Sequence, residues 1–255
     1  MLNILLTNDD GIDAPGLAAM AESVSYAIGL RYPDLPYRFV AVAPDRCRSE
    51  CGHSIESSRP LTLRTVREHW HSVNGTPVDC IRVAHYAMDF RPDVVFSGIN
   101  AGANLGVNLM VSGTFAAARE ASLLGIPAMA ASHYRRPDIA KTWHHTPQWL
   151  AGTIGDFIAE VIDKRSTGTE CAAPLWNVNL PAIVPDPLNV PAVVCCEVDR
   201  CPIDRVGAIG QDGDVRFELD FHARRREQGR DVQHCFDGRI TVSKLGVHLC
   251  HPASK

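Results

Sequence analysis

The sequence lacks long hydrophobic runs, and it carries no large excess of charge of either sign. No apolar stretch reaches the roughly 18 residues that a membrane-spanning helix needs. The N-terminus lacks the basic start and the apolar core of a secretory signal peptide. A formal net charge of −4 gives no general positive field for nucleic acid or for an anionic membrane. We therefore expect a cytoplasmic protein with no membrane partner and no specific nucleic-acid partner.

Several catalytic signatures are missing as well. There is no Gly-Lys-Ser/Thr phosphate loop, no G-x-G-x-x-G after the first predicted strand and no G-x-S-x-G elbow. Their absence disfavours ATP hydrolysis by a phosphate-binding loop, a Rossmann-type oxidoreductase and a serine hydrolase. The nine cysteines form no C-x-x-C pair. We therefore expect small, reduced thiols rather than a zinc site or a disulfide framework.

Apolar runs alternate with helical patterns through the first half of the chain, which is typical of a parallel α/β sheet. The predicted strands are Asn3–Leu6, Phe39–Ala43, Val94–Ser97, the segment after Gly125, and "LWNVNLP". Helices are predicted from Pro15 to Ile28, from Pro77, from about Ala116 to Gly125, and in "TPQWLAGTIGDFIAEVIDK". Residues 54–73 alternate between apolar and polar side chains and predict a β-ribbon insertion. Residues from about 199 to 238 are charged and irregular; a solvated arm is favoured, although their three consecutive arginines could contact phosphate or RNA.

Oxygen-bearing side chains follow three of the predicted strands, at the ends where an open parallel sheet binds its ligands. Asp9 and Asp10 follow the first strand, Ser49 follows the second, and a Gly- and Asn-rich loop at 97–114 follows the third. Such oxygens suit a hard divalent cation, Mg²⁺ or Mn²⁺, which would offset the repulsion between the adjacent carboxylates. Gly11 allows the tight turn that brings both carboxylates to one ion. An ordinary Asp-Gly turn is the alternative, and the acidic spacing does not fit an EF-hand.

The motif "SGTFAAAREASLLG" predicts a helix that follows Ser112, Gly113 and Thr114. A helix N-terminus attracts an anion through its free N–H groups and its dipole. Taken alone, the motif is more simply an ordinary Ser/Thr cap. Together with the oxygen ligands it favours phosphoryl chemistry, with direct attack by metal-activated water rather than a covalent enzyme intermediate.

Four stretches of the sequence resemble the SurE family of metal-dependent nucleotidases. They are "LLTNDDGIDAPGL", "VAPDRCRSECGHSI", "VNGTPVDCIRVA" and "DVVFSGINAGANLGVNLMVSGTFAAAREA". With "GIPAMAAS" and "NVNLP", the resemblance extends from Met1 to about Pro181. It implies a Rossmann-like three-layer α/β core with a mostly parallel sheet. We expect this core in residues 1–190, and in residues 191–255 an extended C-terminal arm that takes part in oligomerisation.

The resemblance also implies a phosphoric monoester hydrolase, of the 5′-nucleotidase or acid-phosphatase type, that acts on nucleoside 5′- or 3′-monophosphates. One divalent metal ion per subunit, Mg²⁺ or Mn²⁺, would be held by Asp9, Asp10, Ser49 and Asn100. The catalytic residues would be Asp9, Asp10 and Asn100, and the phosphate would lie against Asn104, Ser112, Gly113 and Thr114. A homodimer or homotetramer is expected.

Two further hypotheses concern single residues, and one concerns function. We expect Asp9 also to handle the proton of the attacking water. His53 shares a loop with Ser49 and is a candidate phosphate contact. The alternative function is a catalytically silent nucleotide or metal sensor on the same fold. Retention of all four ligand types argues against it, because a pure binder could lose an Asp and still hold a phosphate.

Overall fold

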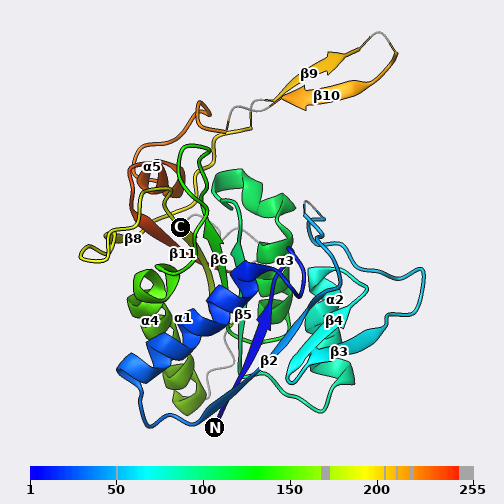
Figure 1. Cartoon of the computed structure of the whole chain (residues 1–255), viewed down its shortest axis with the longest axis vertical. Helices are drawn as coiled ribbons and strands as arrows, with labels where there is room; N and C mark the ends of the chain where they lie inside the picture. Colours follow the sequence, from blue (N-terminus) through cyan, green and yellow to red (C-terminus); the bar gives the residue numbers. More distant parts are fainter. Residues whose placement is uncertain (50, 168–172, 204, 211, 219–220, 247–255) are drawn as a thin grey trace, which may run out of the picture.

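A nine-stranded sheet forms the middle of the molecule (Figure 1). The computed structural model describes residues 1–49, 51–167, 173–203, 205–210, 212–218 and 221–246. In sheet order, the strands are β3 (Leu63–Arg67), β4 (Trp70–Val73), β2 (Tyr37–Pro44), β1 (Leu2–Thr7), β5 (Val94–Asn100), β6 (Ala128–His133), β7 (Leu175–Leu180), β11 (Ile240–Leu245) and β8 (Val193–Cys195).

The neighbouring strands from β4 to β7 all run parallel, as the sequence predicts. Their carboxyl ends therefore lie along one edge of the sheet. From β1 the chain continues to β2 on one side, and it later returns with β5 on the other side. Ligands of open α/β sheets bind where the strand order reverses in this way. The fold thus puts the residues after β1 and after β5 at the preferred ligand position.

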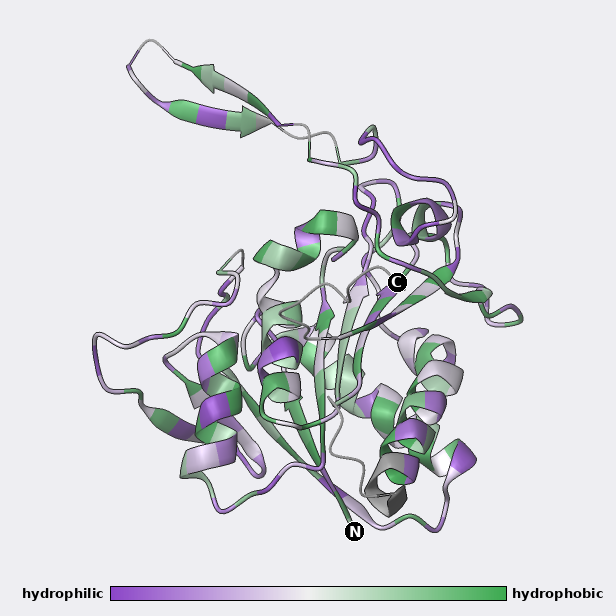
Figure 2. Ribbon diagram, turned by 180° about the vertical axis from the view of Figure 1, so that it is seen from behind, coloured by the Kyte–Doolittle hydropathy of each residue, from purple (hydrophilic) through white to green (hydrophobic). Residues whose placement is uncertain are grey.

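Helices cover both faces of the sheet and give the three layers expected. The helices α1 (Pro15–Arg31) and α4 (Thr146–Thr167) pack on one face, around Ile4, Leu6 and Phe96. The helices α2 (Pro77–Arg82) and α3 (Gly113–Leu123) pack on the other face, around Leu5 and Val95. Strands buried on both faces have no polar side, so the middle strands are largely hydrophobic (Figure 2). Within the described residues, no helix combines the length and the apolar character needed to cross a membrane.

Local signals set several of the predicted boundaries. Helix α1 begins at Pro15, whose missing N–H costs nothing in the first turn. Helix α3 begins after Ser112, whose Oγ accepts a hydrogen bond of 3.1 Å from the Phe115 N–H. It ends just before Gly125, which has φ of +78° and so terminates the helix in the left-handed region. Two short helices, the π-helix Val83–Ala87 and the 3₁₀-helix η2 (Gly106–Val111), complete this half.

The predicted β-ribbon at 54–73 is shorter than expected and is part of the main sheet. Its two strands, β3 and β4, begin only at Leu63. Strand β4 pairs with β2 in parallel, and β3 pairs with β4 in antiparallel fashion. The ribbon therefore extends the edge of the sheet. Residues 54–62, which lack a partner strand, form a loop.

The C-terminal region is more ordered than its charged sequence indicates. We expected an arm at 191–255 and irregular structure at 199–238. Strands β8 and β11 instead join the main sheet, with β11 antiparallel to β7. A hairpin of β9 (Val206–Ile209) and β10 (Val215–Glu218) projects from the body (Figure 1), and α5 (Asp231–Phe236) packs near β11. The alternation Val215-Arg-Phe217-Glu and a turn glycine, Gly213 with φ of +82°, explain the hairpin. The predicted division into a core at 1–190 and an arm at 191–255 stays a prediction. Strands β8 and β11, which lie beyond residue 190, nevertheless belong to the main sheet.

Candidate functional site

The turn after β1 is closed by the side chain of Asn8. Its Oδ1 accepts a hydrogen bond of 3.1 Å from the Gly11 N–H, and its Nδ2 donates one of 2.8 Å to the Gly11 carbonyl. Gly11 has φ of +107°, a conformation that disfavours any residue with a Cβ. The turn thus holds Asp9 and Asp10 at the carboxyl end of the central strand. The tight turn at Gly11 was predicted, but the role of Asn8 was not.

Asp9 lies against the N-terminus of α3. It is 4 % exposed, and its Oδ1 accepts a hydrogen bond from the Thr114 hydroxyl. A Cβ at Gly113 would lie 2.9 Å from the Cβ of Asp9, so only glycine allows this approach. Burial, and secondarily the charge of Asp10, raise the pKa of Asp9 to about 6, although the Thr114 hydrogen bond opposes this. The helix N-terminus that we expected to bind phosphate therefore contacts the Asp9 carboxyl group.

Asp10 connects the ends of β1 and β5. Its Oδ2 accepts a hydrogen bond of 3.2 Å from the Ala101 N–H, one residue beyond β5. Burial raises the pKa of the Asp10 carboxyl group as well. Among the described residues, no Lys, Arg or His side chain lowers the pKa of Asp9 or Asp10. Two neighbouring carboxyl groups are therefore held in a half-closed site without a positive partner from the described chain.

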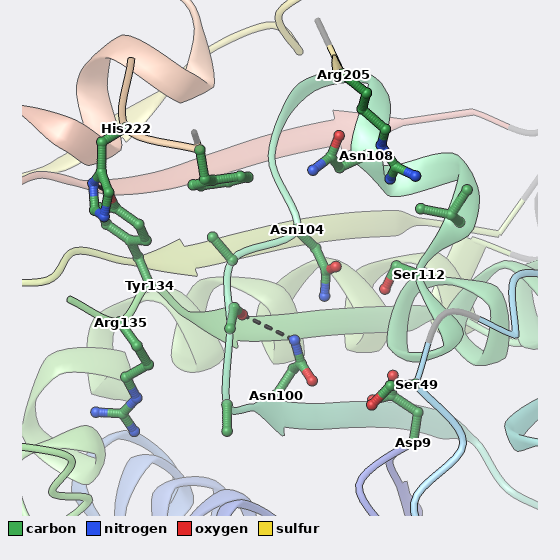
Figure 3. A pocket seen from close by; sticks show the side chains of 15 residues that line it. Asp9, Ser49, Asn100, Asn104, Asn108, Ser112, Tyr134, Arg135, Arg205 and His222 are labelled. Carbon is green, nitrogen blue, oxygen red and sulfur yellow. Dashed lines mark hydrogen bonds between the residues drawn. The ribbon is translucent and has the colours of Figure 1, made fainter. Parts of the chain in front are cut away.

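Asn100 and Ser49 approach this carboxylate pair from two other elements. Asn100, the last residue of β5, donates from Nδ2 to the Gly102 carbonyl at 2.9 Å, and its Oδ1 faces Asp9 (Figure 3). The Arg48 N–H donates to the Asp9 carbonyl at 2.7 Å, which brings Ser49 to the same side of the sheet. The Ser49 hydroxyl lies 2.9 Å from the Cys47 sulfur.

The donor set fits a hard divalent cation. It consists of the carboxylate, hydroxyl and amide oxygens of Asp9, Asp10, Ser49 and Asn100, which are oxygen ligands of the kind that Mg²⁺ and Mn²⁺ prefer. A cation would also relieve the cost of burying the two carboxylates. Among the described residues, no group of three or more His, Cys, Asp or Glu side chains is placed so that it could hold a metal ion.

A cavity of about 440 Å³ opens beside these residues (Figure 3). Five of the predicted site residues line it: Asp9, Ser49, Asn100, Asn104 and Ser112. The other three, Asp10, Gly113 and Thr114, are not among its lining residues. Thr114 is fully buried and is turned toward Asp9. The structure thus brings the predicted ligands together, and among the predicted phosphate contacts it exposes Asn104 and Ser112 to the cavity.

Asn104 is held by a set of polar residues that the sequence analysis missed. Its carbonyl accepts hydrogen bonds of 3.0 Å from Asn177 and Asn179 of β7, and its N–H donates to the Asn179 side chain at 2.9 Å. Its own Nδ2 donates to the Ser132 hydroxyl at 2.8 Å. The signal was present in "LWNVNLP", because buried asparagines at alternate positions of a strand need partners. These bonds fix the backbone of the loop that carries Asn104.

His53, our candidate phosphate contact, is bound to α3 instead. Its Nδ1 accepts a hydrogen bond of 3.0 Å from Arg119, and its Nε2 donates one of 2.9 Å to Glu120. Glu120 is 3 % exposed and also accepts a hydrogen bond of 2.6 Å from Arg82. The hydrogen bond from His53, more than the one from Arg82, lowers the pKa of Glu120. With both ring nitrogens occupied, His53 fastens the Ser49 loop to α3 and does not line the cavity.

The opposite end of the cavity consists of residues that sequence reasoning did not single out. Tyr134 and Arg135 follow β6, and Phe221 and His222 follow the hairpin. Arg205, which precedes the hairpin, also lines the cavity and lies beside Asn108 in Figure 3. In Figure 3, His222 and Tyr134 lie at the far side of the cavity from Asp9 and Ser49. Their sequence positions follow no catalytic motif, so only the fold brings them together. The cavity therefore has an oxygen-rich end and an aromatic end.

Comparison with known proteins places this chain in one family. The family model "Survival protein SurE" matches residues 4–200. A 5′-nucleotidase SurE of Geotalea uraniireducens is 48 % identical over 252 residues, covering 97 % of this chain and 94 % of that protein. A 5′-nucleotidase SurE of Neisseria gonorrhoeae is 35 % identical over 264 residues, with 97 % and 94 % coverage. The crystal structure of the SurE protein from Aquifex aeolicus superposes with a TM-score of 0.74 and 28 % identity, covering 98 % of this chain and 95 % of that one. The chain therefore belongs to the SurE family.

Proposed function

We propose that this protein is a phosphomonoesterase that hydrolyses nucleoside monophosphates with the help of one divalent cation, Mg²⁺ or Mn²⁺. The observation that carries the proposal is the pair of Asp9 and Asp10, held without a cationic partner beside a cavity lined by Ser49 and Asn100. The names of the relatives support the same reaction, because they are 5′-nucleotidases.

The substrate is expected to enter with its phosphate toward Asp9. At that end the Ser112 hydroxyl and the Asn104 amide face the cavity and offer polar contacts to phosphate oxygens. Gly113 and Thr114 act less directly, because they contact Asp9. They orient its carboxyl group and support its ionised form at the N-terminus of α3.

The chain's own residues position the reacting groups. Asp9, Asp10, Ser49 and Asn100 would hold the cation, which when bound lowers the pKa of water and offsets negative charge on the phosphate. The Thr114 hydroxyl and the Ala101 N–H restrain the two carboxyl groups. The Asn8 turn keeps them at the end of β1. Such preorganisation is the main way in which a rigid site contributes to phosphoryl transfer.

A homodimer or homotetramer is part of the proposal. The hairpin β9–β10 carries four strongly exposed apolar side chains, namely Val206, Ile209, Val215 and Phe217. Exposed apolar groups of this kind favour association with another protein surface. Light scattering on the purified protein measures the assembly, and a purely monomeric species would contradict this part of the proposal.

The decisive experiment is phosphate release from a panel of nucleoside 5′- and 3′-monophosphates. Protein stripped with EDTA should be inactive, and added Mg²⁺ or Mn²⁺ should restore turnover. Asp9→Ala should abolish the restored activity. If folded protein released no phosphate from any nucleotide with any of these cations, the hydrolase proposal would fail and a nucleotide or metal sensor would replace it.

A further inference from the structure

The aromatic end of the cavity is a built surface. Tyr134 stacks on Phe236 with ring centroids 4.8 Å apart and an angle of 9° between the planes. Phe221 lies 5.8 Å from both of these rings. Tyr134 is 4 % exposed, so it is fixed in the interior, whereas Phe221 is half-buried and lines the cavity. A ring is thus presented to the cavity on a support of other rings.

Polar groups hold this surface in place from the side. The Tyr134 hydroxyl and the His222 ring form a hydrogen bond. Arg224, which is 5 % exposed, lies 5.4 Å from the centre of the Phe221 ring and donates to the Leu105 carbonyl at 3.4 Å. Arg224 therefore contacts both the Phe221 ring and the backbone carbonyl of Leu105, the residue just before η2.

We propose that this end is the nucleobase subsite and that Phe221 is the residue on which the base stacks. The inference rests on the proposed function, and it specifies which part of the substrate this end recognises. With a phosphate at Asp9, the remainder of a nucleoside monophosphate extends toward the aromatic end of the same cavity (Figure 3). Every nucleobase has a flat π-face that stacks on an aromatic ring.

The size and chemistry of the cavity support a base at this position. Its volume of about 440 Å³ is within the range of small-molecule sites. Arg205 and Asn108 also line it, and their side chains provide hydrogen-bond donors and an amide oxygen for the polar edge of a base or the ribose. A short phosphomonoester without a ring would reach the oxygen-rich end and would leave Phe221 without a contact.

The test compares AMP with ribose 5-phosphate, which has the same sugar and phosphate but no base. In the metal-loaded protein, Phe221→Ala should lower kcat/KM for AMP about tenfold, as expected for one lost stacking contact. The change should appear mainly in KM. The kcat/KM for ribose 5-phosphate should stay within twofold. Phe221→Trp should restore AMP hydrolysis, because it restores a stacking ring. Tyr86 is an exposed aromatic residue that does not line the cavity, so Tyr86→Ala is the matched control. It should leave kcat/KM unchanged for both substrates.

Failure of this inference and failure of the proposed function give different results. If the wild type hydrolyses both substrates and Phe221→Ala affects them equally, the hydrolase proposal stands and the base subsite is refuted. A second readout does not depend on turnover. Titration calorimetry in EDTA should show adenosine binding to the wild type and at least fivefold weaker binding to Phe221→Ala. If adenosine does not bind, or binds equally to both proteins, the base subsite is again refuted.

Discussion

The two ends of the cavity are constructed in different ways. The oxygen-rich end lies on the carboxyl ends of β1 and β5, where Asp9 and Asp10 are each restrained by hydrogen bonds to neighbouring elements. The aromatic end combines Tyr134, the residue after β6, with Phe221 and His222 from the C-terminal region. The residues of the first end directly follow or end strands of the central sheet. The second depends on how a projecting segment lies on that sheet. Under the proposed function, the core would carry the reaction, and the C-terminal region would recognise the nucleoside part of the substrate.

The strongest test of this comparison is Asp9→Asn, which keeps the shape of the side chain and removes its charge. We expect the metal-restored turnover to fall by roughly 10³-fold or more, because a charged ligand beside the phosphate is lost. Asp13→Asn, an exposed carboxylate of the next turn, is the matched control. Near-normal turnover of Asp9→Asn with metal bound would refute both the ligand role and the proton-handling role of Asp9.

The same substitution should make the metal-free protein more stable at neutral pH. The Asp9 carboxyl group titrates near 3.8 when unfolded and at about 6 when folded, so the unfolded state binds fewer protons between these values. The free energy of unfolding in EDTA should therefore fall as the pH rises, by about 2 kcal/mol between pH 4.5 and pH 7.5. Asp9→Asn should lack this component. Chemical denaturation of both proteins at pH 4.5 and pH 7.5 measures the difference, and parallel pH profiles would contradict it.

Glu120→Gln tests whether the oxygen-rich end depends on the network that fastens the Ser49 loop to α3. Loss of the charge that Arg82 and His53 share should lower the free energy of unfolding by about 1–3 kcal/mol. It should also raise the Mg²⁺ concentration needed for half-maximal activity, because Ser49 is displaced. Glu160→Gln, which breaks a half-exposed pair with Lys244, should cost about 0.5 kcal/mol or less. Destabilisation with unchanged Mg²⁺ dependence would separate the network from the site.

The smallest effect is expected at Cys47. Its sulfur lies 2.9 Å from the Ser49 hydroxyl, yet a thiol is a poor ligand for a hard cation. Cys47→Ala should therefore keep Mg²⁺-dependent activity within twofold, whereas Ser49→Ala should reduce it clearly. A large loss in Cys47→Ala, or a change of preference toward Zn²⁺, would show that sulfur contributes to the metal site.

The oxygen-rich end could be predicted because its residues are local to strand ends. Asp9 follows β1 directly and Asn100 ends β5, so the parallel order of the strands brings them together. The turn at Gly11 and the cap at Ser112 have signatures that depend only on nearby residues. Burial of the middle strands on both faces likewise follows from their composition.

The other features of the site could not be predicted, because they depend on contacts between distant parts of the chain. His53 was a reasonable phosphate contact by its position in the loop, but Glu120 and Arg119, more than 60 residues later, bind it instead. Phe221 reaches the cavity only because β11 and α5 return the C-terminal region to the sheet. The asparagines of β7 were visible in the sequence. Their partner, Asn104, could be found only from the pairing of β6 and β7 next to β5.

The hairpin β9–β10 lies between two cavity-lining residues, Arg205 at its start and Phe221 shortly after its end. An insertion, a deletion or a new partner on the hairpin would consequently alter the mouth of the cavity while every metal-ligand candidate stayed in place. If the proposed site and assembly are right, a change in this one segment would alter both the molecules that the cavity accepts and the association of the chain with its copies. For protein engineering, the same segment is the place to alter selectivity without rebuilding the reaction centre.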